Sequence, residues 1–286
     1  MKKIITAVAV AAFGVSAFAQ EVAQENDFAV SAKFDFESRY VKEGKRYVNE
    51  NMQTTISFKY FAPSTSSDLV FTPYADFFWM SPTSNERKGM PISDEGSFTL
   101  GSEIAIGETL MLDFGYKYTG WNDRISGIGM NRAYVNRTNE IYFGLTKTLS
   151  LSDGDPEWDL QGSAYVRYDW NREQLSYELG LKKAFDLNGA TLALGAVYGY
   201  IDCNKVWGDQ RGALGVPGYG TFTLPKGGND YGYVAVTADL SCPINEGTDV
   251  GIGVRYAYNN DGDDQAYNWD NNSSNLWWGA WINFRY

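Results

Sequence analysis

The sequence predicts an all-β protein, built as a single antiparallel up-and-down β-barrel that crosses a membrane. Four observations predict it. Apolar and polar residues alternate at period two in at least twelve segments, and short connections alternate with long ones. Charged residues also gather on one face of the segments, while aromatic residues mark their ends on the other face. We expect about twelve strands, with ten or fourteen left open.

A signal peptide is expected at residues 1–19, ahead of a barrel at residues 20–286. The chain begins with Met-Lys-Lys, continues through an apolar run and reaches Ala17-Phe-Ala19, which is typical of a secretory cleavage site. The apolar run is too short to span a bilayer, which takes about 20 residues. Cleavage would take the net charge from −11 to −13, because Lys2 and Lys3 are lost.

The expected strands are amphipathic, as the last one illustrates: its apolar residues fall on one face and it ends at Tyr286. Asn188-Gly189 predicts a tight hairpin turn, and Pro73 predicts a bulge or an irregular pairing. The final strand is expected to pair with the first and close the barrel. The expected ranges are 28–40, 52–61, 69–80, 98–106, 110–118, 140–149, 158–170, 175–185, 191–201, 231–241, 249–258 and 276–286.

The connections alternate in length. Those after even strands are short, and those after odd strands are mostly long, with 171–174 as the exception. This pattern is typical of bacterial outer-membrane barrels, whose termini and short turns lie in the periplasm. The short connections are 62–68, 107–109, 150–157, 186–190 and 242–248, and the long ones are 41–51, 81–97, 119–139, 202–230 and 259–275.

Charged side chains are expected to line the lumen. Only Lys147 and Lys183 fall on the bulkier, outward face, near the short-turn end, where a lysine can reach the headgroups. The inward residues either tune a water-filled path or pair across a lumen too narrow for solutes, and both readings stay open. The inward bases are Lys33, Arg39, Lys59, Lys117, Arg167, Lys182, Arg255 and Arg285, and the acids are Asp35, Glu37, Asp76, Glu103, Asp113, Glu140, Asp159, Asp169, Glu178, Asp239 and Asp249.

Aromatic side chains are expected to form two belts at the membrane interfaces, where amphipathic rings are enriched. Other tyrosines and tryptophans fall on the inward face, where they would fill space or stack on sugars. The long-loop belt contains Tyr40, Trp79, Tyr118, Trp170, Tyr200 and Tyr258, and Tyr60, Phe185, Phe284 and Tyr286 belong to the other.

Several kinds of chemistry are absent from the sequence. Without histidine there is no Ser-His or Asp-His catalysis and no usual transition-metal site. Paired inward carboxylates such as Asp35 and Glu37 could still do glycosidase chemistry, but a mixed acidic and basic lining is more often a hydrated wall, so we expect no enzyme, no cofactor and no metal. The Asp- and Asn-rich loop 259–275 does not match the spacing of an EF-hand and is expected to be solvated. The negative net charge argues against binding of nucleic acid. Cys203 and Cys242 follow opposite strand ends and should remain unpaired.

The signal peptide, the alternating strands and the terminal aromatic residue together resemble Gram-negative outer-membrane β-barrels. The segment Ser38-Arg-Tyr-Val-Lys-Glu-Gly44 is similar to the Ser-Asp-Tyr-Val-Phe-Arg-Gly opening of a family of small porin-like proteins, from which it departs at Arg39, Lys42 and Glu43. The resemblance implies an outer-membrane protein that contacts lipid and lipopolysaccharide and is assembled through its last strand. We expect a channel for small hydrophilic solutes. A non-conducting barrel that acts in adhesion through its long loops is the alternative, and loop 202–230 could fold into the lumen.

Overall fold

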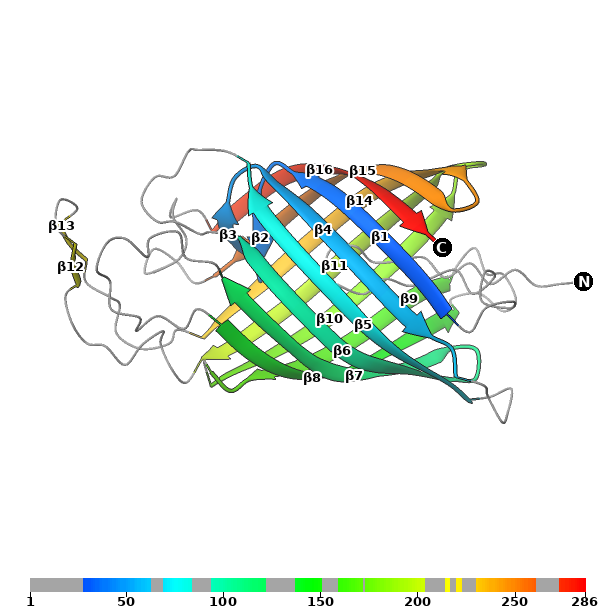
Figure 1. Ribbon diagram of the computed structural model, residues 1–286, viewed down its shortest axis with the longest axis horizontal. Coiled ribbons are helices and arrows are strands. Elements are labelled where there is room, and N and C mark those ends of the chain that lie inside the picture. Colours follow the sequence, from blue (N-terminus) through cyan, green and yellow to red (C-terminus); the bar gives the residue numbers. More distant parts are fainter. Residues whose placement is uncertain are drawn as a thin grey trace, which may run out of the picture.

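Twelve long strands close into one antiparallel barrel in the computed structural model of this protein (Figure 1). The structure describes residues 28–62, 69–83, 94–121, 137–150, 159–171, 173–203, 214–216, 220–222, 230–260 and 273–286. The expected signal peptide, the 259–275 loop apart from its ends and most of the 202–230 loop lie outside these residues. Within them, no helix is long and apolar enough to cross a membrane.

The predicted class and strand number are confirmed, and every expected strand is present with ends that shift by a few residues. The wall strands are β1 (Phe28–Glu37), β4 (Asn51–Tyr60), β5 (Leu69–Pro82), β6 (Glu95–Ile106), β7 (Leu110–Trp121), β8 (Arg137–Ser150), β9 (Asp159–Asp169), β10 (Gln174–Asp186), β11 (Thr191–Cys203), β14 (Tyr231–Asn245), β15 (Thr248–Asn259) and β16 (Ser274–Arg285). A separate small hairpin is formed by β12 (Leu214–Val216) and β13 (Gly220–Phe222).

The first and last strands close the barrel, as the sequence predicts. β1 pairs with β16 from Ser31 opposite Arg285 to Glu37 opposite Gly279. Beyond this ladder, Val30 and Tyr286 exchange two backbone hydrogen bonds of 3.0 and 2.8 Å. Because both strands have a partner on each side, the closed sheet has no free edge along this seam. The start of β1 and the end of the chain lie at the same end of the barrel (Figure 1).

The first expected strand is divided in the structure, and this is the main departure from the sequence prediction. The wall strand β1 ends at Glu37, and the chain then forms a hairpin of β2 (Tyr40–Lys42) and β3 (Lys45–Val48). Its two turn residues, Glu43 and Gly44, have φ angles of +51° and +76°. Two positive φ angles at the centre of a two-residue loop characterise the tight turns that suit β-hairpins.

Two further details bear on the predictions. Asn188 and Gly189 have φ angles of +57° and +109° in the turn between β10 and β11, which confirms the predicted hairpin turn. Pro73 does not cause a bulge, because the register between β5 and β6 is continuous through it. On its other side, the pairing of β5 with β4 ends at Tyr74, so Pro73 has no partner there. The register shifts instead at Pro243, near the end of β14.

The cysteines lie at opposite ends of neighbouring strands. Cys242 is free and exposed, as predicted. In the ladder between β11 and β14, Thr191 pairs with Ser241, whereas Cys203 ends β11 twelve residues farther on. At about 3.4 Å per residue the two cysteines are separated by roughly 40 Å, which is far beyond the reach of a disulfide.

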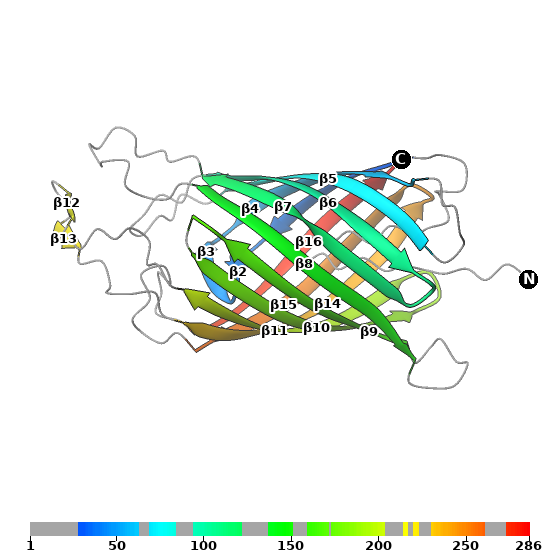
Figure 2. The same ribbon diagram turned by 90° about the horizontal axis from the view of Figure 1, so that it is seen from below.

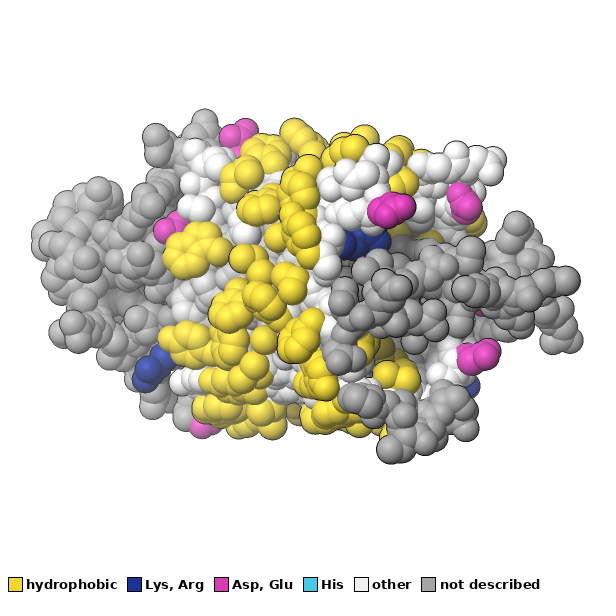
Figure 3. All heavy atoms as spheres, turned by 45° about the vertical axis from the view of Figure 1, so that its right-hand side comes forward, with side chains coloured by type: hydrophobic (Ala, Val, Ile, Leu, Met, Phe, Trp, Pro, Cys, Tyr) yellow, Lys and Arg dark blue, Asp and Glu magenta, His cyan; other side chains and the backbone are white. Residues whose placement is uncertain are grey.

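The outward face of the barrel is apolar. Hydrophobic side chains form a band over the strands, and most of the charged side chains on this face lie toward its two ends (Figure 3). Alternate residues of each strand contribute to the band: Leu179, Ile252 and Leu276, for example, are about 60% exposed. Since an apolar band of this kind is unfavourable in water, the outward face is suited to a non-aqueous environment.

Candidate functional site: the inner wall

The inward face is polar and aromatic, and its large rings lie against glycines. Five aromatic residues each stand directly opposite a glycine on a neighbouring strand: Tyr74 and Gly101, Tyr142 and Gly115, Tyr165 and Gly144, Tyr233 and Gly199, and Trp281 and Gly251. A Cβ atom added at any of these glycines would approach the opposite ring to well under 3.0 Å. Each glycine therefore leaves the space into which a ring folds down along the wall.

Three tyrosines converge on one carboxylate in the middle of the wall. Asp113, on β7, is only 2% exposed. The hydroxyl of Tyr74 donates to its Oδ1 atom at 2.8 Å, and the hydroxyl of Tyr165 donates to Oδ2 at 3.1 Å. Tyr142 joins the cluster through a hydrogen bond with the Tyr74 hydroxyl. Both oxygens of the carboxylate are thus hydrogen-bonded, which favours its burial in the inner wall.

A second cluster adjoins the first. Arg167 forms an ion pair with Glu178, whose carboxylate also accepts a hydrogen bond from the Tyr233 hydroxyl. The guanidinium of Arg167 lies 5.5 Å from the ring centroid of Tyr165, within the range of a cation–π contact. The two clusters therefore form one continuous network over β5 to β14.

A third cluster surrounds Arg255 on β15, next to the β14 end of this network. Its guanidinium contacts Glu37 at 3.1 Å and Asp239 at 3.0 Å, and it is 2% exposed. The indole of Trp277 donates to Glu37 at 3.2 Å. One arginine thus links the carboxylates of β1 and β14 across the two strands between them.

The remaining ion pairs of the wall have the same short reach. Lys59 contacts Glu103 at 2.7 Å, two strands away. Two more ion pairs lie within one strand or between neighbouring strands: Lys33 with Asp35 at 2.6 Å, and Arg285 with Asp249 at 2.8 Å. Lys33 also lies 5.2 Å from the ring of Trp281.

In the part of the chain that the structure describes, side chains of the wall contact one another only over short steps around the ring of twelve strands. The strands that they join are no more than three apart. The longest step is the contact between Tyr74 on β5 and Tyr142 on β8. Opposite walls would be six strands apart. The wall residues therefore pair around the circumference and form a lining, and these contacts do not bridge the lumen.

The β2–β3 hairpin does bridge it. Lys42 contacts Glu95 of β6 at 3.5 Å, and the carbonyl of Gly44 accepts a hydrogen bond of 2.8 Å from Asn259 of β15. A Cβ on Gly44 would lie 2.6 Å from that of Tyr233, on β14. β6 and β14 are six strands apart and thus opposite each other. In both ribbon views the hairpin lies within the outline of the barrel, at the end with the long connections (Figures 1 and 2).

Apolar contacts hold the same hairpin. Val41 packs against a buried group of Ala235, Ala257 and Trp277. The ring of Tyr40 stacks on that of Phe78, with the centroids 6.4 Å apart. The hairpin is therefore fixed to both walls by apolar packing as well as by polar contacts.

Two expected site residues are placed differently from the sequence prediction. Tyr40 is not an outward aromatic, because the chain leaves the wall before it and carries its ring inward, where it is 8% exposed. Arg39 follows β1 and lines a cleft at the rim instead of the lumen wall. Both were assigned on the assumption that the first strand continues to residue 40.

The other expected site residues keep the face that the period-two alternation assigns to them. On the outward face, Phe284 packs edge-on against Phe34, and the exposed aromatics there are Trp79, Tyr118, Trp170, Tyr200, Tyr258 and Tyr286. The remaining inward residues include Asp76, Lys117, Asp169 and Lys182.

The longer β6 adds the inward carboxylate Glu95, which the sequence interpretation missed because it began that strand at residue 98. Glu95 joins the eleven expected carboxylates and Arg39 leaves the eight expected bases, so the expected inward set becomes twelve acidic and seven basic residues.

Comparison with known proteins shows the fold alone. No protein-family model and no curated protein matches the chain. Among solved structures, an outer membrane channel from Pseudomonas putida F1 is similar, with 10% identity and a TM-score of 0.52 over 91% of this chain and 96% of that one. The β domain of the Bordetella autotransporter BrkA (11% identity, TM-score 0.47, 91% and 99% covered) and a KdgM porin (8%, 0.44, 90% and 98%) resemble it more weakly. The chain therefore has the architecture of an outer-membrane β-barrel.

Proposed function

We propose that this protein resides in the outer membrane of a Gram-negative bacterium, with the chain ends and short turns in the periplasm. The apolar outward band supports this proposal, as do the aromatic side chains at the strand ends and the long connections at one end only. The terminal strand β16 is the element that the assembly machinery would recognise, because it closes the barrel against β1.

Within that membrane, the protein would act as a narrow channel for passive diffusion of small hydrophilic solutes. One observation carries this proposal: the ion pairs and tyrosine clusters of the wall run around the circumference and do not cross the lumen. A lining of this kind presents charged and hydroxyl groups along a path through the barrel. Few of these groups are buried by contacts across the centre of the lumen. The β2–β3 hairpin would set the width of the outer entrance, since it spans opposite walls there.

The alternative is a non-conducting barrel that acts through its long loops. The hairpin is the observation that favours it, because a loop fixed to opposite walls also closes a mouth. The expectation that the chain is not an enzyme stays a prediction.

A shortened hairpin separates the two functions. Glu37 and Asn51 are direct partners in the β1–β4 ladder, so residues 39–49 can be replaced by Asn-Gly to join the two strands directly. In planar bilayers, a channel should give discrete, salt-dependent current steps for the wild type and steps several-fold larger for the variant. A silent wild type with a conducting variant would support the closed barrel. Silence of both, with the barrel shown to be folded by heat-modifiable gel migration, would contradict the channel.

A further inference from the structure

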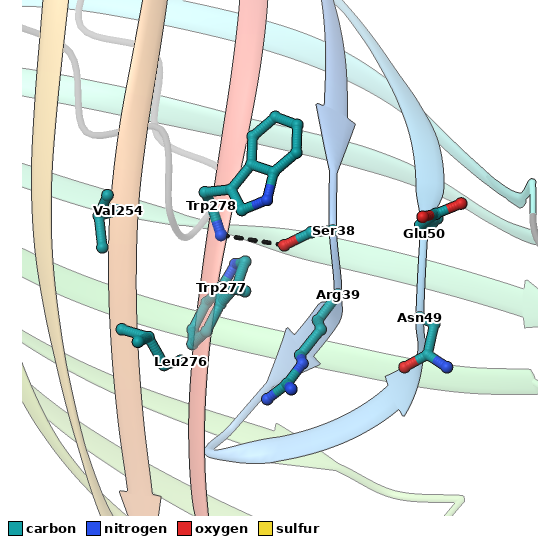
Figure 4. Close-up of a pocket in the computed structure, with 8 residues that line it drawn as sticks. All are labelled: Ser38, Arg39, Asn49, Glu50, Val254, Leu276, Trp277 and Trp278. Atoms are coloured by element: carbon teal, nitrogen blue, oxygen red, sulfur yellow. Dashed lines mark hydrogen bonds between the residues drawn. The ribbon is translucent and has the colours of Figure 1, made fainter.

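The barrel wall is interrupted at the rim that carries the long connections. β1 pairs with β16 only as far as Gly279 and with β4 only as far as Asn51, but β16 extends five residues farther, to Ser274. The chain leaves the wall at this point to form the β2–β3 hairpin. A cleft of about 720 Å³ opens there (Figure 4), lined by Ser38, Arg39, Asn49, Glu50, Val254, Leu276, Trp277 and Trp278. Its volume is within the usual range for small-molecule sites.

One side of the cleft is apolar and continuous with the outward band. Val254, Leu276 and Trp278 lie on the outward face of β15 and β16 and are 54%, 61% and 52% exposed. The position of Trp278 is fixed, because its backbone N–H donates to the hydroxyl of Ser38 at 3.0 Å and its carbonyl accepts from the Ser38 N–H at 2.9 Å. This side would accept an acyl chain from the surrounding bilayer.

The other side is polar and carries one cation, Arg39, and one carboxylate, Glu50, which form no ion pair with each other in the part of the chain that the structure describes. Arg39 extends from the β1–β2 junction toward β16, next to Leu276 and Trp277 (Figure 4). Within the described part of the chain it forms no ion pair, and the carboxylate of Glu37 is paired with Arg255. A guanidinium is suited to phosphate because its fork of donors can bind two oxygens at once. Asn49 and Glu50 add groups able to bond hydroxyls of a headgroup.

We propose that this cleft binds one phosphorylated lipid, with the phosphate on Arg39 and an acyl chain along Val254, Leu276 and Trp278. A soluble phosphate would leave the apolar side uncovered, and a neutral lipid would leave the guanidinium without an anion. The combination of both sides at a membrane rim therefore selects an amphipathic anion. The proposal requires that the barrel lies in a membrane, but it does not require a conducting lumen.

Native mass spectrometry of the full chain in a non-ionic detergent tests this proposal. Phosphatidic acid should give one saturable adduct, and diacylglycerol with the same acyl chains should bind at least tenfold more weakly. Arg39→Gln should weaken phosphatidic acid binding about tenfold or more, because it removes a charge-assisted contact, and Arg39→Lys should restore part of the loss. Leu276→Ser should weaken it through the apolar side. Lys147→Gln is the matched control, since this exposed lysine lies on the outward face near the opposite rim.

Each contrary result would overturn the proposal. Equal binding of phosphatidic acid by the wild type and Arg39→Gln would remove the arginine from the site. Equal binding of diacylglycerol would mean a neutral-lipid groove. Displacement of the adduct by millimolar inorganic phosphate would indicate a free-phosphate site. Heat-modifiable migration of each variant confirms that the barrel is folded, and the bilayer currents test the lumen separately, so failure here leaves the channel proposal standing.

Discussion

Gly144→Ala tests whether the glycines opposite the inward rings hold those rings against the wall. The new Cβ would lie 2.6 Å from Cδ1 and Cζ of Tyr165, whereas ordinary contacts begin near 3.4 Å. The ring must therefore move by about 1 Å, which disrupts its 3.1 Å hydrogen bond to Asp113. Overpacking costs about 1–3 kcal/mol, and a lost hydrogen bond to a charged group costs about 1.5–3 kcal/mol. We expect a destabilisation of about 2–5 kcal/mol.

The measurement is urea unfolding of the barrel in detergent micelles, followed by tryptophan fluorescence. Gly162→Ala is the matched control, because its Cβ would be at least 3.5 Å from its nearest neighbours and should be neutral or stabilise by about 0.5–1 kcal/mol. In a Tyr165→Ala background, Gly144→Ala should cost little, since the clashing ring is absent. Equal unfolding midpoints for Gly144→Ala and Gly162→Ala would refute the reasoning.

Three more predictions concern the charges and the terminal strand. Arg255→Met should destabilise the barrel by about 3–5 kcal/mol in the same unfolding assay, because it leaves two carboxylates without their cation; adding Glu37→Gln should recover part of the loss, and an unchanged midpoint would contradict the assignment. Replacing Phe284 and Tyr286 with aspartate should reduce the yield of heat-modifiable protein in outer-membrane fractions before any transport changes, and normal insertion would disprove the role of β16 in closure. If the channel conducts, the excess of inward carboxylates should make it selective for cations. The reversal potential in a KCl gradient measures this selectivity, and a potential of the sign that anion selectivity gives would contradict the prediction.

The fold could be predicted from the sequence because the alternation of a barrel strand is local. A residue such as Phe34 shows its face from its immediate neighbours, without knowledge of the strand beside it, and the lengths of the connections then give the order of the strands. The same locality explains why twelve strands were recovered with errors only at their ends.

The inner wall could not be predicted to the same extent, because its contacts depend on register. That Tyr165 rests on Gly144 and hydrogen-bonds Asp113 follows from pairing across β7, β8 and β9, which alternation does not specify. A partial signal existed, since inward aromatic residues and inward glycines on neighbouring strands can be aligned once a hairpin register is assumed. For the same reason, the sequence alone does not decide between side chains that fill the lumen and side chains that line a path.

The end of β1 at Glu37 accounts for both the narrowed entrance and the cleft. The tight turn at Glu43-Gly44 folds the chain back on itself too early for residues 38–50 to serve as wall. The chain turns inward here and carries Tyr40 and Val41 into the lumen. As a result, no strand lies between β16 and β4 at this rim, and Arg39 lies beside Leu276. A first strand that continues to residue 40 would place Tyr40 outward and Arg39 inward on the wall, whereas Tyr40 lies inside the barrel and Arg39 lines the rim cleft. In the sequence, Gly44 after Lys42-Glu43 is the signal for this turn, because glycine readily adopts the positive φ that a tight hairpin turn requires. The two proposed roles of this rim, selecting solutes and binding lipid, both depend on the turn.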